Sequence, residues 1–428
     1  MRELLRRRWE ELPASVRTPN QLAGVGGVAC GATHGIHERC NFACTSCYLS
    51  DVANRTPSLP FEEVRAQLET LRAYLGSGGK VQITSGEVSL LPVEELGRIV
   101  AHARALGLDP MVMSHGERFL EEPRYLEELV GRYGLRKVSI HVDSTQRGRA
   151  GWVEGMRERE LHPIRDRYAQ LIRDTRRATG EHLHAAHTVT LTPHNLADVP
   201  DIVEWALANV DAFRMLSFLP AAEVGRTRDR SQADLTMQGL WERICQPIGR
   251  LLHRDAMRFG HPECNLTVPT LVLQGRRGLH VFEGARADSE RDARAYARGL
   301  RNLSTAIDLD DGHLRNLGRV LARLMARPWL LGEAASYAVR RAWSDRRLLG
   351  ALLDNLVRGR GARLYPLMLV VHKFMDAQEL ETEEGRERLA ACVFKLPVDG
   401  RMVSMCEMNA SGMRRDQNER QRALSPQS

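Results

Sequence analysis

Short apolar stretches alternate with longer amphipathic stretches between residues 27 and 220, and this alternation limits the fold more than any other feature of the sequence. In one amphipathic stretch, Val64, Leu68 and Leu71 recur at the spacing of a single helix face. Strands are predicted just before Cys40 and at 80–84, 110–114, 137–143, 187–191 and 212–220. Because repeated strand–helix units form parallel sheets, we predict an α/β fold containing a partial (β/α)6 TIM-like barrel.

The alternation stops after about residue 230. Arginine-rich helices are predicted at 285–300 and 310–360, followed by a strand at 367–372. Residues 392–406 form a predicted hairpin, because two alternating stretches meet at Asp399–Gly400, a favoured turn pair. We therefore predict a helical extension at 1–26, the barrel at 27–230, a mainly helical domain carrying the cysteine-flanked hairpin at 231–410, and a disordered polar tail at 411–428.

Composition and charge narrow the class of protein. Charged residues make up 27% of the 428 residues, which is typical of a soluble globular protein. The first 17 residues lack the apolar core of a secretory signal, and the longest apolar run, 364–371, is too short to span a bilayer. We therefore expect a cytoplasmic protein with no transmembrane segment, in which cysteines are ligands or free thiols rather than disulfides.

The net charge of +7 raises the question of a nucleic-acid partner. Most basic residues are arginines dispersed among acidic residues, as in the segments "RELLRRRWEE" and "RERELHPIRDRYAQ". This pattern is typical of solvated, salt-bridged helix faces rather than of a clustered phosphate-binding stripe. We therefore expect no specific nucleic-acid partner.

Three cysteines follow the first predicted strand, in the segment "RCNFACTSCY". Cys40, Cys44 and Cys47 have the spacing C-x3-C-x2-C, which places three thiols on one loop. Thiolates hold iron–sulfur clusters, whereas a closed structural zinc site needs four ligands, and the sequence offers no fourth cysteine nearby. The pattern favours a cluster with one iron left open to another ligand, and a zinc site is the alternative.

Other polar groups follow the later strands in the same way. They are Ser85–Gly86–Glu87, Ser114–His115–Gly116 and Asp143. In parallel α/β sheets, functional groups gather in the loops at the carboxyl ends of the strands. The sequence therefore predicts a single site at that edge of the sheet.

The cysteine motif and the strand–helix units together resemble the radical S-adenosylmethionine (SAM) superfamily over about residues 28–227. The resemblance implies a [4Fe-4S] cluster on Cys40, Cys44 and Cys47 whose fourth iron binds SAM. It also implies reductive cleavage of SAM to a 5′-deoxyadenosyl radical that abstracts hydrogen from an unactivated carbon. A one-electron donor such as flavodoxin or ferredoxin would then be a partner.

The resemblance extends to the residues that follow the strands. "SGE" at 85–87 resembles the family's Gly-Gly-Glu element, "SHG" at 114–116 its strand-three turn, and "VSIHVD" at 138–143 its ribose-binding strand. "FLPAAEVGR" at 218–226 resembles the end of strand six, near the adenine. The family usually has an aromatic residue where Ser46 stands here, and Tyr48 or Phe42 would have to replace that contact. The implied cofactor-binding residues are Tyr48, Ser85, Gly86, Glu87, Ser114, His141, Asp143 and Pro220, and Glu87 and Asp143 are also predicted to be catalytic.

A second set of cysteines lies in the carboxyl-terminal part of the chain. Cys392 and Cys406 flank the predicted hairpin, as in the auxiliary-cluster hairpin of many radical SAM enzymes, and "HPEC" adds Cys264. These segments, with "HKFMDA", resemble a branch that contains archaeal tetraether lipid synthases and a pterin-methylating enzyme of methanogens. The resemblance implies a second iron–sulfur cluster on these three cysteines, with Cys245 as a further candidate ligand. Buried free thiols are the alternative, and we favour it for Cys30 and Cys245.

We therefore predict a radical SAM enzyme that acts on a small molecule or a lipid by methylation, carbon–carbon bond formation or rearrangement. Modification of a peptide or a tRNA is the alternative within the same superfamily. An alternative of another class is a non-catalytic, zinc-stabilised binding protein that uses its basic surface.

Overall fold

The computed structural model describes residues 1–229, 235–275, 278–287, 289–303, 306, 313–345, 350 and 363–424. Within these residues, eleven strands form one sheet in the order β11-β10-β1-β2-β3-β4-β5-β6-β9-β7-β8. The strands are β1 (Cys30–Ala32), β2 (Lys80–Ile83), β3 (Asp109–Ser114), β4 (Lys137–His141), β5 (His184–Leu191), β6 (Phe213–Pro220), β7 (Asn265–Gly275), β8 (Gly278–Glu283), β9 (Arg363–His372), β10 (Phe394–Val398) and β11 (Arg401–Ser404).

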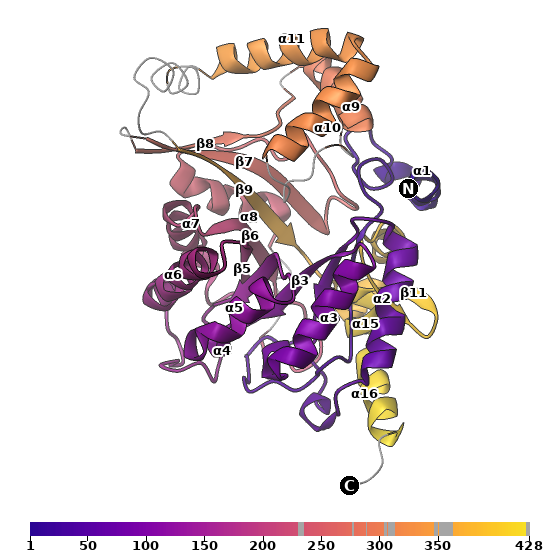
Figure 1. The fold of residues 1–428 in the computed structure, drawn as a ribbon, viewed down its shortest axis with the longest axis vertical. Helices are drawn as coiled ribbons and strands as arrows, with labels where there is room; N and C mark the ends of the chain where they lie inside the picture. Colours follow the sequence, from indigo (N-terminus) through magenta and orange to yellow (C-terminus); the bar gives the residue numbers. More distant parts are fainter. Residues whose placement is uncertain are drawn as a thin grey trace.

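The middle of the sheet is parallel and follows the predicted strand–helix order. Strands β1 to β6 pair in sequence, each parallel to the next. The curved sheet carries helices on its outer side, as Figure 1 shows. These helices are α2 (Phe61–Leu75), α3 (Val93–Ala105), α4 (Glu117–Glu121), α5 (Pro123–Gly131), α6 (His162–Thr179) and α7 (Val199–Ala208). The predicted α/β partial barrel is confirmed.

Each outer helix buries one apolar stripe against the sheet. In α2 the buried stripe comprises Val64, Leu68, Leu71 and Leu75, at the spacing of one helix face. The helix ends at Gly76, whose φ of +81° is a conformation that residues with a side chain rarely adopt. The core therefore lies between the helices and the sheet, and the loops at the carboxyl ends of the strands are left to form a site.

The carboxyl-terminal part of the chain adds strands to both edges of this sheet. Strand β10 pairs parallel with β1, and β9 pairs parallel with β6. Strand β7 is antiparallel to both β9 and β8, a hairpin that the sequence did not predict. The predicted hairpin at 392–406 is formed by β10 and β11, and Asp399 and Gly400 in its turn both have positive φ, as a two-residue turn requires.

The remaining helices precede the parallel strands β1 to β6 or follow them in the chain. They are α1 (Arg2–Glu11), α8 (Met237–Cys245), α9 (Glu290–Leu303), α10 (His313–Ala326), α11 (Trp329–Ser344), α13 (Ala377–Leu380), α14 (Glu383–Ala390), α15 (Met405–Ala410) and α16 (Met413–Leu424). Figure 1 places α9, α10 and α11 at one end and α16 at the opposite end. Residues 310–312, 346–349 and 351–360 of the predicted helix at 310–360 lie outside the described residues.

The prediction of a disordered tail at 411–428 is wrong for Met413–Leu424. These residues form α16, which buries Arg414 and Asn418. The tail looks disordered from its sequence because it is almost entirely polar. Its order comes from contacts with a distant loop, which are described below. Residues 425–428 lie outside the described part of the chain.

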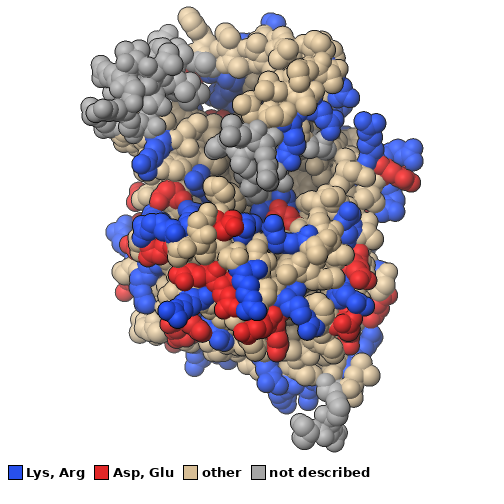
Figure 2. All heavy atoms as spheres, viewed as in Figure 1, with Lys and Arg blue, Asp and Glu red and all other residues tan. Residues whose placement is uncertain are grey.

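Charged side chains are mixed over the face of the molecule that Figure 2 displays. Several pairs join residues three or four apart on helices, such as Arg65 with Glu62 at 2.9 Å and Arg132 with Glu128 at 2.6 Å. This agrees with the salt-bridged helix faces expected from the sequence. None of the helices in the described residues has both the length and the apolar character needed to cross a bilayer.

Candidate active site

The loop that follows β1 carries Cys40, Cys44 and Cys47, at the carboxyl end of the strand. Backbone hydrogen bonds fasten this loop to two other segments of the barrel. After β4, the carbonyl groups of Arg147 and Thr145 accept from the N–H groups of Ala43 at 2.7 Å and Thr45 at 2.8 Å. After β6, the N–H groups of Arg226 and Arg228 donate to the carbonyl groups of Cys47 at 2.8 Å and Thr45 at 2.7 Å. The cysteine loop is therefore held across the mouth of the barrel.

The three thiols are half-buried and interact with one another. Burial raises the pKa of Cys40 to about 12 and raises the pKa of Cys44 well above its ordinary value. The guanidinium of Arg226 donates to Cys47 Sγ at 3.4 Å. No three Cys, His, Asp or Glu side chains in the described residues form a group that could hold a metal ion as they stand. The thiols are neighbours on one loop, and their chemistry is that of iron–sulfur ligands.

Four buried polar atoms around this loop have no hydrogen-bond partner within the described residues. They are Glu38 Oε2 and Ser46 Oγ on the cysteine loop, and His141 Nε2 and Ser144 Oγ at the end of β4. Buried polar groups are nearly always hydrogen-bonded, so unsatisfied atoms gathered in contacting loops indicate a polar ligand that completes them. The thiol set and these atoms together fit a cluster with a polar organic cofactor.

Glu87, the predicted acceptor for that cofactor, already accepts several hydrogen bonds from the protein. Its Oε1 accepts from Ser89 N at 3.1 Å, Ser89 Oγ at 2.6 Å and Ser114 Oγ at 2.7 Å, and its Oε2 accepts from His115 N at 2.8 Å. Burial opposes ionisation, but nearby His115 and these donors lower the pKa of Glu87 overall. Glu87 is therefore an ionised group that ties the end of β2 to the end of β3.

Ser85 and Gly86, the two residues before Glu87, lie against the start of the cysteine loop. Ser85 donates to Glu38, and Glu87 N donates to the carbonyl oxygen of Arg39 at 2.9 Å. Gly86 has a φ of +62°, and a Cβ at this position would clash with the carbonyl oxygen of His37. Glycine is required here because the cysteine loop passes directly over the backbone of residue 86.

The residues that follow β3 also contact the cysteine loop. His115 stacks on Phe42 with 3.9 Å between ring centroids, and its Nε2 hydrogen-bonds Asn41 Oδ1 at 2.8 Å. Ser114 Oγ accepts from Gly116 N at 2.8 Å. The aromatic partner of the loop is therefore Phe42, whereas Tyr48 turns its hydroxyl toward Thr84 Oγ1 at 3.3 Å.

At the end of β4, His141 is half-buried and Asp143 is buried. Burial lowers the pKa of His141 to about 4, so its imidazole is neutral at physiological pH. Burial, followed by the nearby Glu158, raises the pKa of Asp143 to about 6. The Asp143 carboxylate accepts from Thr145 N at 3.0 Å and Thr190 N at 2.8 Å. Pro220 lies at the end of β6, where it pairs with Leu191 of β5.

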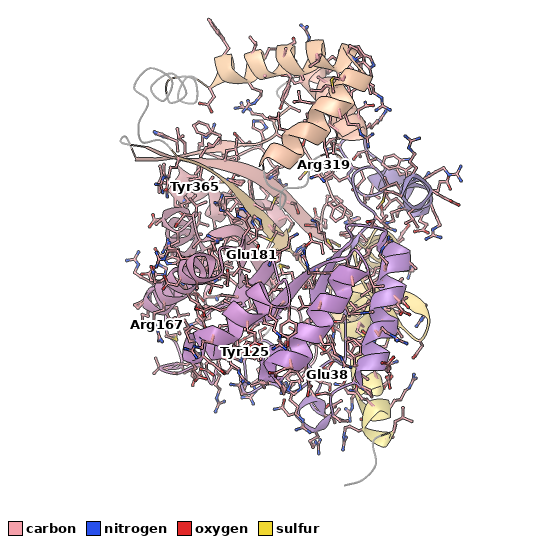
Figure 3. The ribbon with its side chains drawn as sticks, in the orientation of Figure 1. Glu38, Tyr125, Arg167, Glu181, Arg319 and Tyr365 are labelled. Carbon is pink, nitrogen blue, oxygen red and sulfur yellow. The ribbon has the colours of Figure 1, made fainter. Side chains whose placement is uncertain are left out.

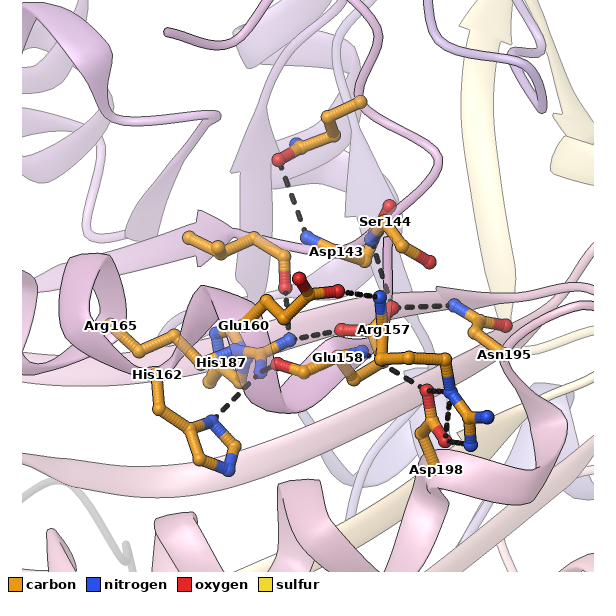
Figure 4. A network of polar contacts seen from close by, with 12 residues as sticks. Asp143, Ser144, Arg157, Glu158, Glu160, His162, Arg165, His187, Asn195 and Asp198 are labelled. Atoms are coloured by element: carbon orange, nitrogen blue, oxygen red, sulfur yellow. Dashed lines mark hydrogen bonds and ion pairs between the residues drawn. The ribbon is translucent and has the colours of Figure 1, made fainter. Parts of the chain in front are cut away.

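A buried ion pair holds the loop after β4, as Figure 4 shows. Glu158 pairs with Arg165, and neither side chain is exposed to solvent. Glu158 Oε1 accepts from Ser144 N at 2.8 Å and Asn195 Nδ2 at 2.7 Å, and Arg165 Nη2 donates to the carbonyl oxygen of Val142 at 2.9 Å. The charge pattern predicts a solvated helix face for the segment containing Glu158 and Arg165, and this prediction is wrong for these two residues. Their burial depends on the fold and leaves no local signal.

Helix α16 clamps the other side of the cysteine loop. Arg414 Nη1 donates to Glu38 Oε1 at 3.2 Å, and its guanidinium lies 4.7 Å from the centroid of the Tyr48 ring. Asn418 Nδ2 donates to Ser50 Oγ at 2.8 Å. Glu38 lies near the end of the molecule that carries α16 (Figure 3). This clamp leaves no local signal in the sequence, because its residues are 368 and 376 positions apart.

The second set of cysteines lines a separate cavity of about 40 Å³. Cys264 precedes β7, Cys392 precedes β10, and Cys406 lies in the first turn of α15. Burial raises the pKa of all three thiols. Arg388 Nε donates to Cys264 Sγ at 3.1 Å. The structure therefore brings together three cysteines that the sequence separates by up to 142 residues, from 264 to 406.

Two histidines line the same cavity, His261 and His372. Glu263 N donates to His261 Nδ1 at 3.2 Å, so one nitrogen of that ring is already used. Cys245 does not line the cavity; it lies at the end of α8, where Leu252 N donates to its Sγ at 3.5 Å. Cys30 lies within β1. The structure thus does not bring the further candidate Cys245 together with the other three.

Comparison with known proteins indicates the superfamily of the domain that contains the cysteine loop. Residues 36–206 match the family model described as the Radical SAM superfamily. No curated protein gives a significant match. A solved structure of hexahistidine-tagged anSMEcpe "with bound AdoMet" is similar at 12% identity, with a TM-score of 0.32, over 44% of this chain and 50% of that chain. The chain thus spans about half the length of that protein.

Residues 36–206 of this chain form a domain of the radical SAM superfamily. Such a domain indicates an enzyme of that superfamily and implies an iron–sulfur cluster and SAM as cofactors. The match begins just before the cysteine loop and ends in α7, so it covers that loop and the loops after β2, β3 and β4, but not β6 or α16.

Proposed function

We propose that this enzyme holds a [4Fe-4S] cluster through Cys40, Cys44 and Cys47 and uses it to act on an unactivated carbon of a small molecule or a lipid. The observation that carries the proposal is the position of three thiols on one anchored loop at the carboxyl ends of parallel strands. With the cluster and SAM bound, the cofactors supply reductive cleavage to a 5′-deoxyadenosyl radical.

The protein's own residues supply binding and order. Because burial raises the pKa of Cys40 and Cys44, these thiols are protonated in the absence of metal, and ligand binding releases their protons. Arg226 donates a charge-assisted hydrogen bond to the sulfur of Cys47. The unpaired atoms of Glu38, Ser46, His141 and Ser144 are the groups that we assign to contacts with the cofactor.

The other predicted cofactor residues have a supporting role in this proposal. Glu87 and Asp143 keep the ends of β2, β3, β4 and β5 in register, because their oxygens accept hydrogen bonds from those segments. Ser85 and Gly86 seat the cysteine loop. Direct contact of SAM with Tyr48, Glu87, Ser114, Asp143 or Pro220 stays a prediction.

The cavity lined by Cys264, Cys392 and Cys406 is the proposed site of a second iron–sulfur cluster. Its support is the convergence of three thiols from three separate segments, together with the cationic hydrogen bond that Arg388 donates to Cys264. Such a donor favours the thiolate form that metal binding requires. His372 also lines the cavity, and burial lowers its pKa to about 4, so its imidazole is neutral as a metal ligand must be; it is the proposed fourth ligand.

Anaerobic reconstitution with iron and sulfide tests the proposal. Two cubane clusters correspond to about eight iron atoms per chain, and dithionite with SAM should then yield 5′-deoxyadenosine. An iron-free protein that retains stoichiometric zinc and does not cleave SAM would contradict it. Following deuterium from labelled lipids, small metabolites, peptides and tRNA into 5′-deoxyadenosine distinguishes the proposed substrates from the alternatives, because only the true substrate transfers label.

A further inference from the structure

Helices α10 and α11 expose large apolar side chains at the end of the molecule opposite α16 (Figure 1). On α10, Leu317, Leu321 and Met325 are between 46% and 74% exposed. These residues are four apart, so they form one ridge along the helix, about 12 Å long at 1.5 Å per residue. Exposed apolar residues are common singly, but a continuous ridge marks an interaction surface.

Helix α11 carries a second ridge of the same kind. Leu331, Val339 and Trp343 are all exposed and share one face, with Ala335 between them. Trp329 is exposed at the other end of the helix. The two tryptophans are 14 positions apart, which corresponds to about 21 Å along the helix axis. Tryptophan is enriched where proteins meet the interface between lipid and water.

The charge of this segment is almost entirely positive. Residues 313–344 contain six arginines and a single acidic residue, Glu333. Arg298 of α9 pairs with that glutamate, and Arg340 pairs with Asp292 of α9. Arg319 lies on α10, as Figure 3 shows. Figure 2 shows the contrast with the rest of this face, where acidic and basic side chains are mixed. Exposed apolar ridges on a segment with an excess of positive charge complement an anionic surface with an apolar layer beneath it.

We propose that the α10–α11 face, defined by Leu317, Leu321, Met325, Trp329, Val339 and Trp343, docks this enzyme on the surface of an anionic lipid bilayer. The helices lie in the plane of the interface, with their apolar ridges among the acyl chains and their arginines near the lipid phosphates. The proposal uses neither cysteine site, so it stands independently of the proposed catalytic function.

Vesicle flotation with the full-length, reconstituted protein tests this docking. We expect the protein to float with vesicles of phosphatidylcholine containing phosphatidylglycerol, to bind pure phosphatidylcholine vesicles at least ~10-fold more weakly, and to dissociate as salt rises. The variant L321S/M325S/W343S should lose at least ~10-fold in binding, because it removes apolar contact area from both ridges. A wild-type protein that does not float with anionic vesicles would overturn the proposal.

The matched control places three serines at equally exposed apolar positions elsewhere. Val153, Leu251 and Leu424 are 58%, 56% and 83% exposed, and the variant V153S/L251S/L424S should bind vesicles as the wild type does. Equal loss of binding in both variants would contradict the assignment of this face. Sedimentation of the wild type and L321S/M325S/W343S decides the remaining alternative: if the substitutions convert a dimer to a monomer and flotation is absent, the face joins two copies of the chain and the proposal is wrong.

Discussion

The two groups of cysteines reach their positions in different ways. The first group lies within residues 40–47 of one loop, whereas the second group, Cys264, Cys392 and Cys406, comes from three segments. The first group depends on local spacing and on hydrogen bonds that fix a loop. The second group depends on the strand order, because β10 joins one edge of the parallel sheet and β9 joins the other. The first group can therefore be recognised from its spacing alone, because its three cysteines are close together in the chain. The second group comes together only in the folded structure, because the strand order brings its cysteines together.

The largest expected effect comes from removing the first group. The variant C40A/C44A/C47A should lose about four iron atoms per chain and reduce 5′-deoxyadenosine formation at least ~100-fold, because these thiols hold the cluster that binds SAM. Iron analysis and product quantification by liquid chromatography measure both quantities. Cleavage of SAM at the wild-type rate by this variant would show that the two groups have been assigned the wrong way round.

Removing the second group of cysteines should lower the iron content without abolishing SAM cleavage. The variant C264A/C392A/C406A should also lose about four iron atoms, but it should retain SAM cleavage within about threefold of the wild type. Cys245→Ala is the matched control, since Cys245 is a buried thiol outside the cavity, and it should leave the iron content unchanged. If the triple variant kept its full iron content, the second group would consist of free thiols and the comparison would fail.

A third prediction concerns the clamp on the first group. Arg414→Ala leaves Glu38 buried without its cationic partner, so we expect unfolding to become easier by about 3 kcal/mol and iron to be lost faster to a chelator. Chemical denaturation and the rate of iron release measure these changes. Arg420→Ala is the control on the same helix, because its pair with Asp399 is exposed, and it should cost under about 1 kcal/mol. Equal effects of the two substitutions would rule out a clamp by α16.

The smallest expected effect concerns pH and the polar scaffold of the first site. The pKa of Asp143 in the folded protein is about 6, above its ordinary value of 3.8. Between these values the folded protein binds more protons than the unfolded chain, so this carboxyl group lowers stability as pH rises from about 4 to about 6, by up to about 3 kcal/mol. Denaturation curves at several pH values should therefore show a flatter dependence for Asp143→Asn than for the wild type. An identical pH dependence would mean that Asp143 has an ordinary pKa.

The parallel part of the fold could be predicted because apolar residues recur at helical spacing in its helices and form short apolar runs in its strands. The β7–β8 hairpin could not, since Pro269 interrupts the first of its strands, and proline usually argues against a paired strand. In the structure Pro269 lies opposite Met368 of β9, within an antiparallel pair. Strand β7 forms because it pairs with β8 and β9, and β9 is distant from it in the sequence.

The candidate site was predictable to the extent that its residues lie in local motifs. The cysteine loop and the residues that follow β2, β3 and β4 were found from their positions after predicted strands. Glu38, Glu158, Arg165 and Arg414 were not found, because an ionic residue that becomes buried looks like any surface charge until its partner is known. These ion pairs are the parts of the scaffold that connect distant segments.

Mössbauer spectroscopy of 57Fe-reconstituted C264A/C392A/C406A tests the central claim most directly, because only the cluster of the first group then remains. The account predicts about four irons per chain, one of which changes its isomer shift and quadrupole splitting when SAM is added, since that iron has no protein thiolate. Four equivalent irons that are unaffected by SAM, or zinc in place of iron, would contradict the account.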